Sequence, residues 1–144
     1  MKRNRILIIL STLLLVLDLG TKYVFYNKSF GSDSSFIQAS FNSGISWSVP
    51  LPRIFIIILS LLGLIFIIFL YLKQKINITI TAFLLAGTLG NLIDRIFLHG
   101  VRDFINIGIL NFPIFNLADI FLNIGIILLI LMEFFCLKNK LKNI

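Results

Sequence analysis

Residues 54–72 read IFIIILSLLGLIFIIFLYL and contain no charged side chain over 19 positions. A helix of this length extends about 28 Å, which matches the roughly 30 Å hydrocarbon core of a bilayer. The stretch therefore predicts a transmembrane helix. Three further apolar runs of similar length lie at about 6–26, 76–98 and 114–137. We predict an all-α membrane protein with four transmembrane helices in a single domain, residues 1–144.

The composition supports a membrane protein. Hydrophobic residues make up 58% of the 144 residues and charged residues 13%, whereas soluble domains have about 45–50% and 25%. A soluble globular protein is thereby excluded. The single cysteine and the single histidine exclude an intramolecular disulfide and a Cys/His zinc cluster, and we expect no metal and no cofactor.

Basic residues predict the orientation in the membrane. They gather at both ends of the chain and in the short turn between the second and third runs: Lys2, Arg3, Arg5, Lys73, Lys75, Lys138, Lys140 and Lys142. By the positive-inside rule, the termini and this turn are cytoplasmic, and the longer connections at about 27–53 and 99–113 lie outside. The net charge of +7 then reports orientation and contact with membrane lipid, so we expect no nucleic-acid partner.

Two local features concern the outer segments and the N-terminus. A turn at 31–35 precedes an apolar/polar alternation at 36–41, which predicts a small extracytoplasmic β-element. Trp47 follows and is expected to anchor the chain at the outer interface. The first apolar run also resembles a cleavable signal peptide, but no small-x-small site follows it. We therefore expect an uncleaved first helix.

Polar residues of the helices converge on one depth near the predicted outer surface. With a rise of about 1.5 Å per residue, three helices bring polar side chains to this level. Residues three or four apart share a helical face, which groups them into three stripes: Asp18 with Lys22; Asn91 with Asp94 and Arg95; Asn116 with Asp119 and Asn123. A structural interpretation treats Asp18 with Lys22, and Asp94 with Arg95, as ion pairs that hold the bundle together.

Two carboxylates have no obvious cation, namely Asp103 in the second outer connection and Asp119 in the fourth helix. If that connection folds back over the helix, the two carboxyls meet in a partly desolvated site where like charge keeps one protonated. Such a pair supplies a base for an attacking water and an acid for the leaving amine. Buried carboxylates also occur in proton- or ion-conducting bundles, so the residues alone leave both interpretations open.

Five sequence blocks resemble those of the lipoprotein signal peptidase (signal peptidase II) family, in the family's order over nearly the whole chain. They are DLGTK at 18–22, NSG at 42–44, GTLGNLIDR at 87–95, VRDF at 101–104, and FNLAD at 115–119 followed by Gly125. The chain departs from the family pattern after the second block, where Ile45, Ser46 and Trp47 replace small residues, and at Ala86, where the family has glycine.

The resemblance implies an aspartic endopeptidase of the bacterial cytoplasmic membrane. Such an enzyme removes signal peptides from diacylglyceryl-modified prolipoproteins and cuts before the lipidated cysteine. The implied fold has four helices, a small extracytoplasmic β-cradle and a short interfacial helix. The implied catalytic dyad is Asp103 and Asp119, and the residues implied to bind substrate or support the site are Asn42, Gly44, Asn91, Arg95, Asn116, Asp18, Lys22, Asp94 and Ala118. Inhibition by globomycin and a monomeric state complete this expectation.

Two other functions remain as alternatives. In a small ion- or proton-coupled transporter or channel subunit, Asp18, Asp94 and Asp119 would line a path. We expect the cytoplasmic halves of the four helices to lack interior polar residues other than Glu133, which disfavours such a path. In a structural membrane adaptor, the polar residues would serve packing alone. A liposome flux assay with the purified protein tests the transporter, whereas the adaptor predicts that substitution of both Asp103 and Asp119 leaves lipoprotein processing unchanged.

Overall fold

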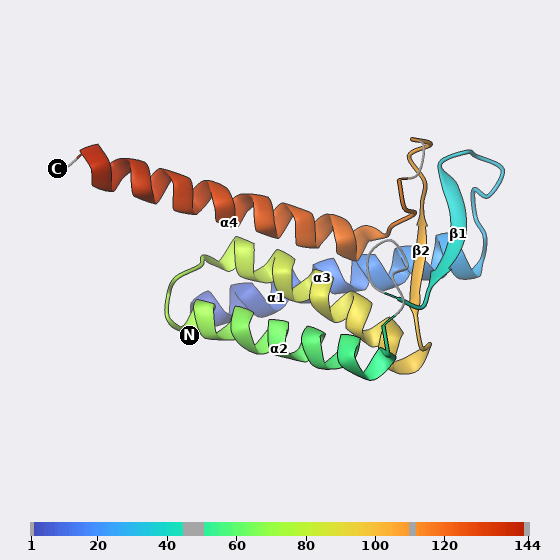
Figure 1. Ribbon diagram of the computed structural model, residues 1–144, viewed down its shortest axis with the longest axis horizontal. Helices are drawn as coiled ribbons and strands as arrows, with labels where there is room; N and C mark the ends of the chain where they lie inside the picture. The colour runs from blue at the N-terminus through green and yellow to red at the C-terminus, as the bar shows by residue number, and fades with distance from the viewer. Residues whose placement is uncertain (1, 45–50, 110–111, 143–144) are drawn as a thin grey trace.

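The computed structural model describes residues 2–44, 51–109 and 112–142. Four long helices and a small sheet make up this part of the chain (Figure 1). In chain order the elements are α1 (Lys2–Thr21), its π-helical extension η1 (Lys22–Asn27), β1 (Ile37–Asn42), α2 (Arg53–Leu72), α3 (Ile78–Phe97), β2 (Val101–Ile105) and α4 (Leu117–Lys142).

The four predicted membrane spans are confirmed as helices that are long and apolar enough to cross a bilayer. Three boundaries differ from the prediction by three residues or more. The first helix begins at Lys2 rather than at residue 6, and the fourth extends over Leu117–Lys142 rather than over 114–137. The fourth helix starts later because Phe115 forms a β-bridge with Ile105, which holds the preceding residues in an extended conformation.

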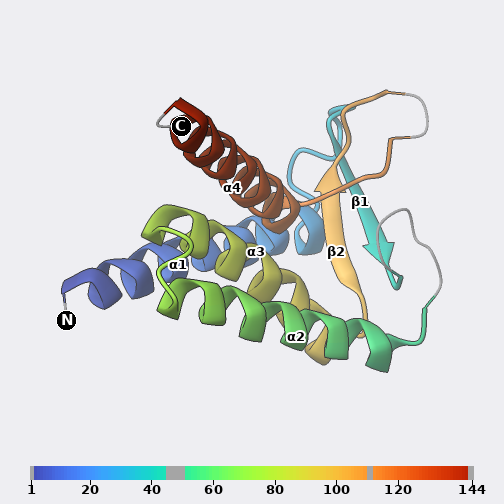
Figure 2. The ribbon, with the colours of Figure 1, turned by 60° about the vertical axis from the view of Figure 1, so that its left-hand side comes forward.

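Helix α3 is the centre of the bundle. It packs against α1, α2 and α4. In the apolar stretch of each span, 56% of the residues are buried in α3, compared with 11–22% in the other three. Figures 1 and 2 show α3 between α4 on one side and α2 on the other. Its buried face carries small residues, including Ala82, Ala86, Gly87 and Gly90. Small side chains allow helix backbones to approach closely, which is how membrane helices gain packing energy.

The two strands form an antiparallel pair that crosses one end of the bundle, which we call the sheet end (Figure 2). Ser40 is opposite Asp103 and Asn42 is opposite Val101, with an irregularity between Ile37 and Ser40. The alternation at 36–41 correctly predicted β1. Both chain termini and the turn between α2 and α3 lie at the other end (Figure 1). A separate short helix in the connections is not among the elements of the described ranges, so that detail stays a prediction.

Glycines set the close contact between α3 and α4. A Cβ atom added to Gly87 would lie 2.5 Å from the carbonyl oxygen of Ala118 and 2.7 Å from Cγ of Leu122. From the side of α4, a Cβ atom on Gly125 would lie 2.6 Å from Cδ2 of Leu84. Because the first of these contacts is to backbone, a substitution at Gly87 forces the two helices apart.

We expect Gly87→Ala to lower the free energy of unfolding by about 1–3 kcal/mol, the usual cost of overpacking a well-packed interface. Thermal unfolding of the protein in detergent micelles measures the effect. Gly63→Ala in α2 is the matched control, because nothing lies within 4 Å of an added Cβ atom there. An equal response of the two variants would contradict this account of the α3–α4 contact.

Candidate active site

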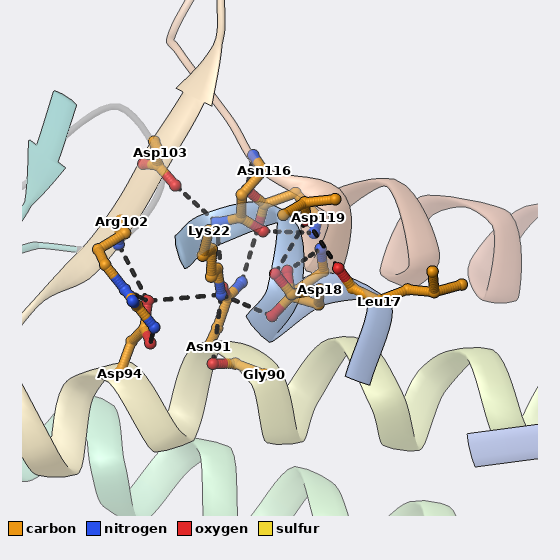
Figure 3. A network of polar contacts seen from close by, with 12 residues as sticks. Leu17, Asp18, Lys22, Gly90, Asn91, Asp94, Arg102, Asp103, Asn116 and Asp119 are labelled. Atoms are coloured by element: carbon orange, nitrogen blue, oxygen red, sulfur yellow. Dashed lines mark hydrogen bonds and ion pairs between the residues drawn. The ribbon is translucent and has the colours of Figure 1, made fainter. Parts of the chain in front are cut away.

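A buried ammonium group organises the sheet end of the bundle (Figure 3). Lys22 has no exposed surface, and its Nζ lies 2.8 Å from Oδ2 of Asp18 and 3.5 Å from Oδ2 of Asp94. The same group donates hydrogen bonds to the Gly90 carbonyl at 3.3 Å and to Oδ1 of Asn91 at 3.1 Å. The ion pair expected between Asp18 and Lys22 is therefore confirmed, and it extends to α3.

The prediction of an ion pair between Asp94 and Arg95 is wrong. Asp94 instead pairs with Arg102 of β2, whose Nη2 lies 2.7 Å from Oδ1, and it also accepts the Arg102 backbone N–H at 3.1 Å. Neighbouring residues on a helix point about 100° apart, so the Arg95 side chain points away from the ion pair of Asp94. Its guanidinium makes two long hydrogen bonds, to the carbonyls of Asn91 at 3.4 Å and Gly44 at 3.5 Å.

Sequence reasoning missed the role of Arg102. Successive side chains of a strand point to opposite faces, and in β2 this sends Arg102 toward Asp94 while Asp103 turns the other way (Figure 3). A strand is predicted by alternating apolar and polar residues, and the block Val-Arg-Asp-Phe does not alternate in this way. Without recognition of the strand, the adjacent Arg102 and Asp103 could not be assigned to different faces.

Asn116 joins the two carboxylates that lack a cation. Its Nδ2 donates to Oδ1 of Asp103 at 2.6 Å, and its backbone N–H donates to Oδ2 of Asp119 at 3.1 Å. The Asp119 backbone N–H donates in return to Oδ1 of Asn116 at 3.1 Å. This reciprocal pair is a capping box at the start of α4. A second amide, Nδ2 of Asn91 in α3, donates to Oδ1 of Asp119 at 2.8 Å.

Neither Asp103 nor Asp119 has an ion pair among the residues that the structure describes, since Lys22 and Arg102 are occupied by Asp18 and Asp94. Asp103 is only 3% exposed, whereas Asp119 is half-buried. Burial, followed by the negative charge of Asp119, raises the pKa of Asp103 to about 7, against the opposing effect of hydrogen bonds from Asn116 and Asn42. At neutral pH the Asp103 carboxyl therefore holds a proton for a large part of the time.

Both carboxylates line a cavity of about 420 Å³. Polar groups of Asn42, Asn91 and Arg95 share this lining. The remaining wall is mostly apolar and comes from β2, the segment before α4 and α4 itself: Val101, Phe112, Pro113, Ile114, Phe115, Leu122, Asn123 and Ile126. The cavity can therefore receive a ligand that is polar at the carboxylates and apolar beside them.

The other residues named from the sequence form hydrogen bonds around this site. Ala118 has no exposed surface, and its backbone N–H donates to Oδ1 of Asp18 at 2.9 Å, which fixes the start of α4 to α1. The Gly44 N–H donates to Oδ1 of Asn42 at 3.0 Å.

Trp47 lies in 45–50, outside the described residues. Within the described ranges, no three His, Cys, Asp or Glu side chains form a group that could hold a metal ion.

The fold and the site define a multi-pass membrane protein with a pair of carboxylates at a cavity at one end of its helix bundle. Residues 10–135 match the model of the family described as signal peptidase (SPase) II. The chain therefore belongs to the signal peptidase II family and is a membrane peptidase by family. The resemblance noted in the five sequence blocks is thereby confirmed.

Curated relatives and a solved structure agree with this membership. The lipoprotein signal peptidase of Microcystis aeruginosa is 32% identical, with 92% of this chain and 94% of that protein covered. That of Enterococcus faecalis is 36% identical, with 83% and 81% covered. A solved structure described as a bacterial membrane enzyme is similar with a TM-score of 0.79 and 29% identity, covering 93% of this chain and 90% of that one.

We expect Lys22→Met to lower the free energy of unfolding by about 3–5 kcal/mol, because it leaves the buried Asp18 without its cation. Chemical unfolding in detergent micelles measures the change. Lys28→Met is the control, since Lys28 is exposed and its ammonium only lies over the ring of Tyr23. If both variants lost the same stability, the Lys22 cluster would not be the centre of this end of the bundle.

Proposed function

We propose that this chain is an aspartic endopeptidase that removes the signal peptide from diacylglyceryl-modified prolipoproteins, cutting before the lipidated cysteine. One observation carries the catalytic part of the proposal. Asp103 and Asp119 are joined through Asn116 at the wall of one cavity, and neither has an ion pair among the described residues. Family membership supports the substrate class.

The burial of the two carboxyls assigns their roles. Like charge keeps one carboxyl of such a bridged pair protonated, and Asp103, which is almost fully buried, holds the proton. Asp119 is half-buried and faces the cavity, so it is the base that takes a proton from water as the water attacks the peptide carbonyl. The Asp103 carboxyl donates a hydrogen bond to the oxyanion that forms, and then gives its proton to the leaving amine.

Neighbouring amides and a guanidinium position the substrate in this proposal. Asn91 and Asn116 fix the two carboxyls through the hydrogen bonds described above, and they prevent either from rotating away. Arg95 and Asn42 face the same cavity. The long hydrogen bonds of Arg95 leave its guanidinium available to bind a carbonyl oxygen of the substrate.

The membrane orientation is part of the same proposal. We place the termini and the turn at 73–75 in the cytoplasm, because the basic residues gather there. The sheet end and the cavity then lie near the outer surface of the bacterial cytoplasmic membrane, where a translocated precursor presents its cleavage site. Action as a monomer and inhibition by globomycin follow from the family resemblance and belong to the same proposal.

A transporter or channel is a weaker proposal for this fold. A conducting path needs polar groups through the whole membrane, but the interior of the other end is a cluster of apolar side chains from α1, α2 and α3 with the segment before α3: Leu7, Ile67, Tyr71, Ile76, Ile80, Ala82 and Leu84. The network around Lys22 lies at the sheet end, while the polar contacts at the other end join Tyr71 to Arg3 and Asn4. A structural adaptor would not require two carboxylates without cations at a cavity.

We expect Asp103→Asn and Asp119→Asn each to lower the rate of cleavage by roughly 100- to 10,000-fold, because each removes one partner of the acid–base pair. The assay follows the purified variants with a diacylglyceryl-modified precursor in micelles. Asp33→Asn, in the exposed turn before β1, is the control and should cleave normally. Near-normal turnover by either site variant would contradict the dyad. Equal cleavage of a precursor without the lipid would contradict the proposed substrate class.

We expect the cleavage rate to fall as the pH rises above about 7. The proposed acid, Asp103, has a pKa of about 7, so it is protonated below that pH and loses its proton above it. A profile of kcat/KM between pH 5 and pH 9 measures this limb. Circular dichroism at each pH controls for unfolding. A rate that climbs steadily through pH 7 to pH 9 would reverse the assignment of the acid.

A further inference from the structure

Asn123 is an exposed amide in the apolar span of α4. Its side chain makes no hydrogen bond within the part of the chain that the structure describes. The two other asparagines that line the cavity, Asn42 and Asn91, are both hydrogen-bonded. Asn123 therefore differs from its neighbours in having an amide donor and acceptor without a protein partner.

The position makes this amide costly to keep. Asn123 lies roughly 9 Å along a membrane-spanning segment of roughly 35 Å, at 1.5 Å per residue. A carboxamide in an apolar environment without a hydrogen bond is unfavourable, and polar residues within membrane spans commonly mark substrate paths. Stability alone therefore does not account for an asparagine at this position.

The cavity supplies the partner that is missing. Asn123 is one helical turn beyond Asp119 on the same face of α4, and both line the cavity. Its neighbours on the wall, Leu122 and Ile126, are apolar. A carboxamide both donates and accepts, so in such surroundings it complements a peptide group. A substrate supplies such groups, because the segment being cleaved must be extended and its backbone N–H and C=O are then unpaired in an apolar site.

We propose that Asn123 is a substrate-positioning residue whose carboxamide hydrogen-bonds a backbone peptide group of the signal peptide, on the side of the scissile bond that remains in the membrane. This inference rests on the proposed function. From Asp119 the helix continues toward the other end of the bundle, so Asn123 contacts the part of the substrate that lies deeper than the cleavage point. The contact adds to the binding of the extended segment and is made away from the reacting peptide bond.

Such a contact predicts a separation between binding and chemistry. The hydrogen bond is made in the bound ground state and is kept in the transition state, so its loss raises KM and leaves kcat nearly unchanged. It also predicts a separation between function and stability. Removing an amide that has no protein partner does not weaken the folded protein, whereas removing a structural hydrogen bond does.

The experiment compares Asn123→Leu with wild-type protein and with Asn139→Leu, the same substitution at an exposed position near the far end of α4. The readouts are kcat and KM for a diacylglyceryl-modified precursor and the thermal unfolding temperature in micelles. We expect Asn123→Leu to raise KM by roughly 5- to 10-fold, with kcat within roughly twofold and an unfolding temperature no lower than that of the wild type. Asn139→Leu should match the wild type. Asn123→Gln keeps the carboxamide, so its KM should lie between those of Asn123→Leu and the wild type.

Other outcomes overturn the inference in distinguishable ways. An unchanged KM in Asn123→Leu, while the wild type cleaves the precursor, rejects the contact and leaves the proposed function intact. A lower unfolding temperature with a proportional loss of kcat assigns Asn123 a structural role instead. If the wild type cleaves no lipidated precursor, the proposed function fails and this inference fails with it.

Discussion

The ammonium of Lys22 holds together the elements that build the site. It lies between Asp18 of α1 and Asp94 of α3, and through these two carboxylates it reaches the start of α4 and strand β2. Three charged groups are taken out of water in this cluster, which is unfavourable unless each is paired and hydrogen-bonded. The arrangement meets this requirement, because the second carboxylate is also neutralised by Arg102. The positions of Asp103 and Asp119 follow from the elements that this cluster fixes.

This use of the cations explains why two acids remain free for chemistry. Near the sheet end, Lys22 and Arg102 are engaged with Asp18 and Asp94, and Arg95 turns toward the cavity instead of pairing with its neighbour. The amides of Asn91 and Asn116 then satisfy the remaining acids without neutralising them. A neutral donor holds a carboxylate in place while leaving its charge and its proton available, which a lysine or arginine in the same position would not do.

Much of the architecture was predictable because a membrane span is read from length and hydropathy alone. The four spans, the common level of their polar residues and the pair of Asp18 with Lys22 were all within reach of the sequence. The sequence did not reveal β2, whose residues Val-Arg-Asp-Phe-Ile show no period of two, since Asp103 and Phe104 are both buried. The partner of Asp94 was consequently misassigned to Arg95. Bridging by Asn116 was also out of reach, because it depends on how far the segment before α4 folds back onto β2.

Strand β2 places residues with opposite tasks at consecutive positions. Arg102 binds the scaffold through Asp94, and Asp103 turns to the cavity through Asn116. A shift of one residue in strand register exchanges the two faces. An insertion of one residue in the short segment between α3 and β2 would put Arg102 in the place of Asp103, so that a guanidinium reaches the wall of the cavity. A deletion of one residue would put Asp103 in the place of Arg102, so that a carboxylate faces Asp94. Either change in loop length would therefore remove the carboxyl from the site while leaving the composition of the strand unchanged.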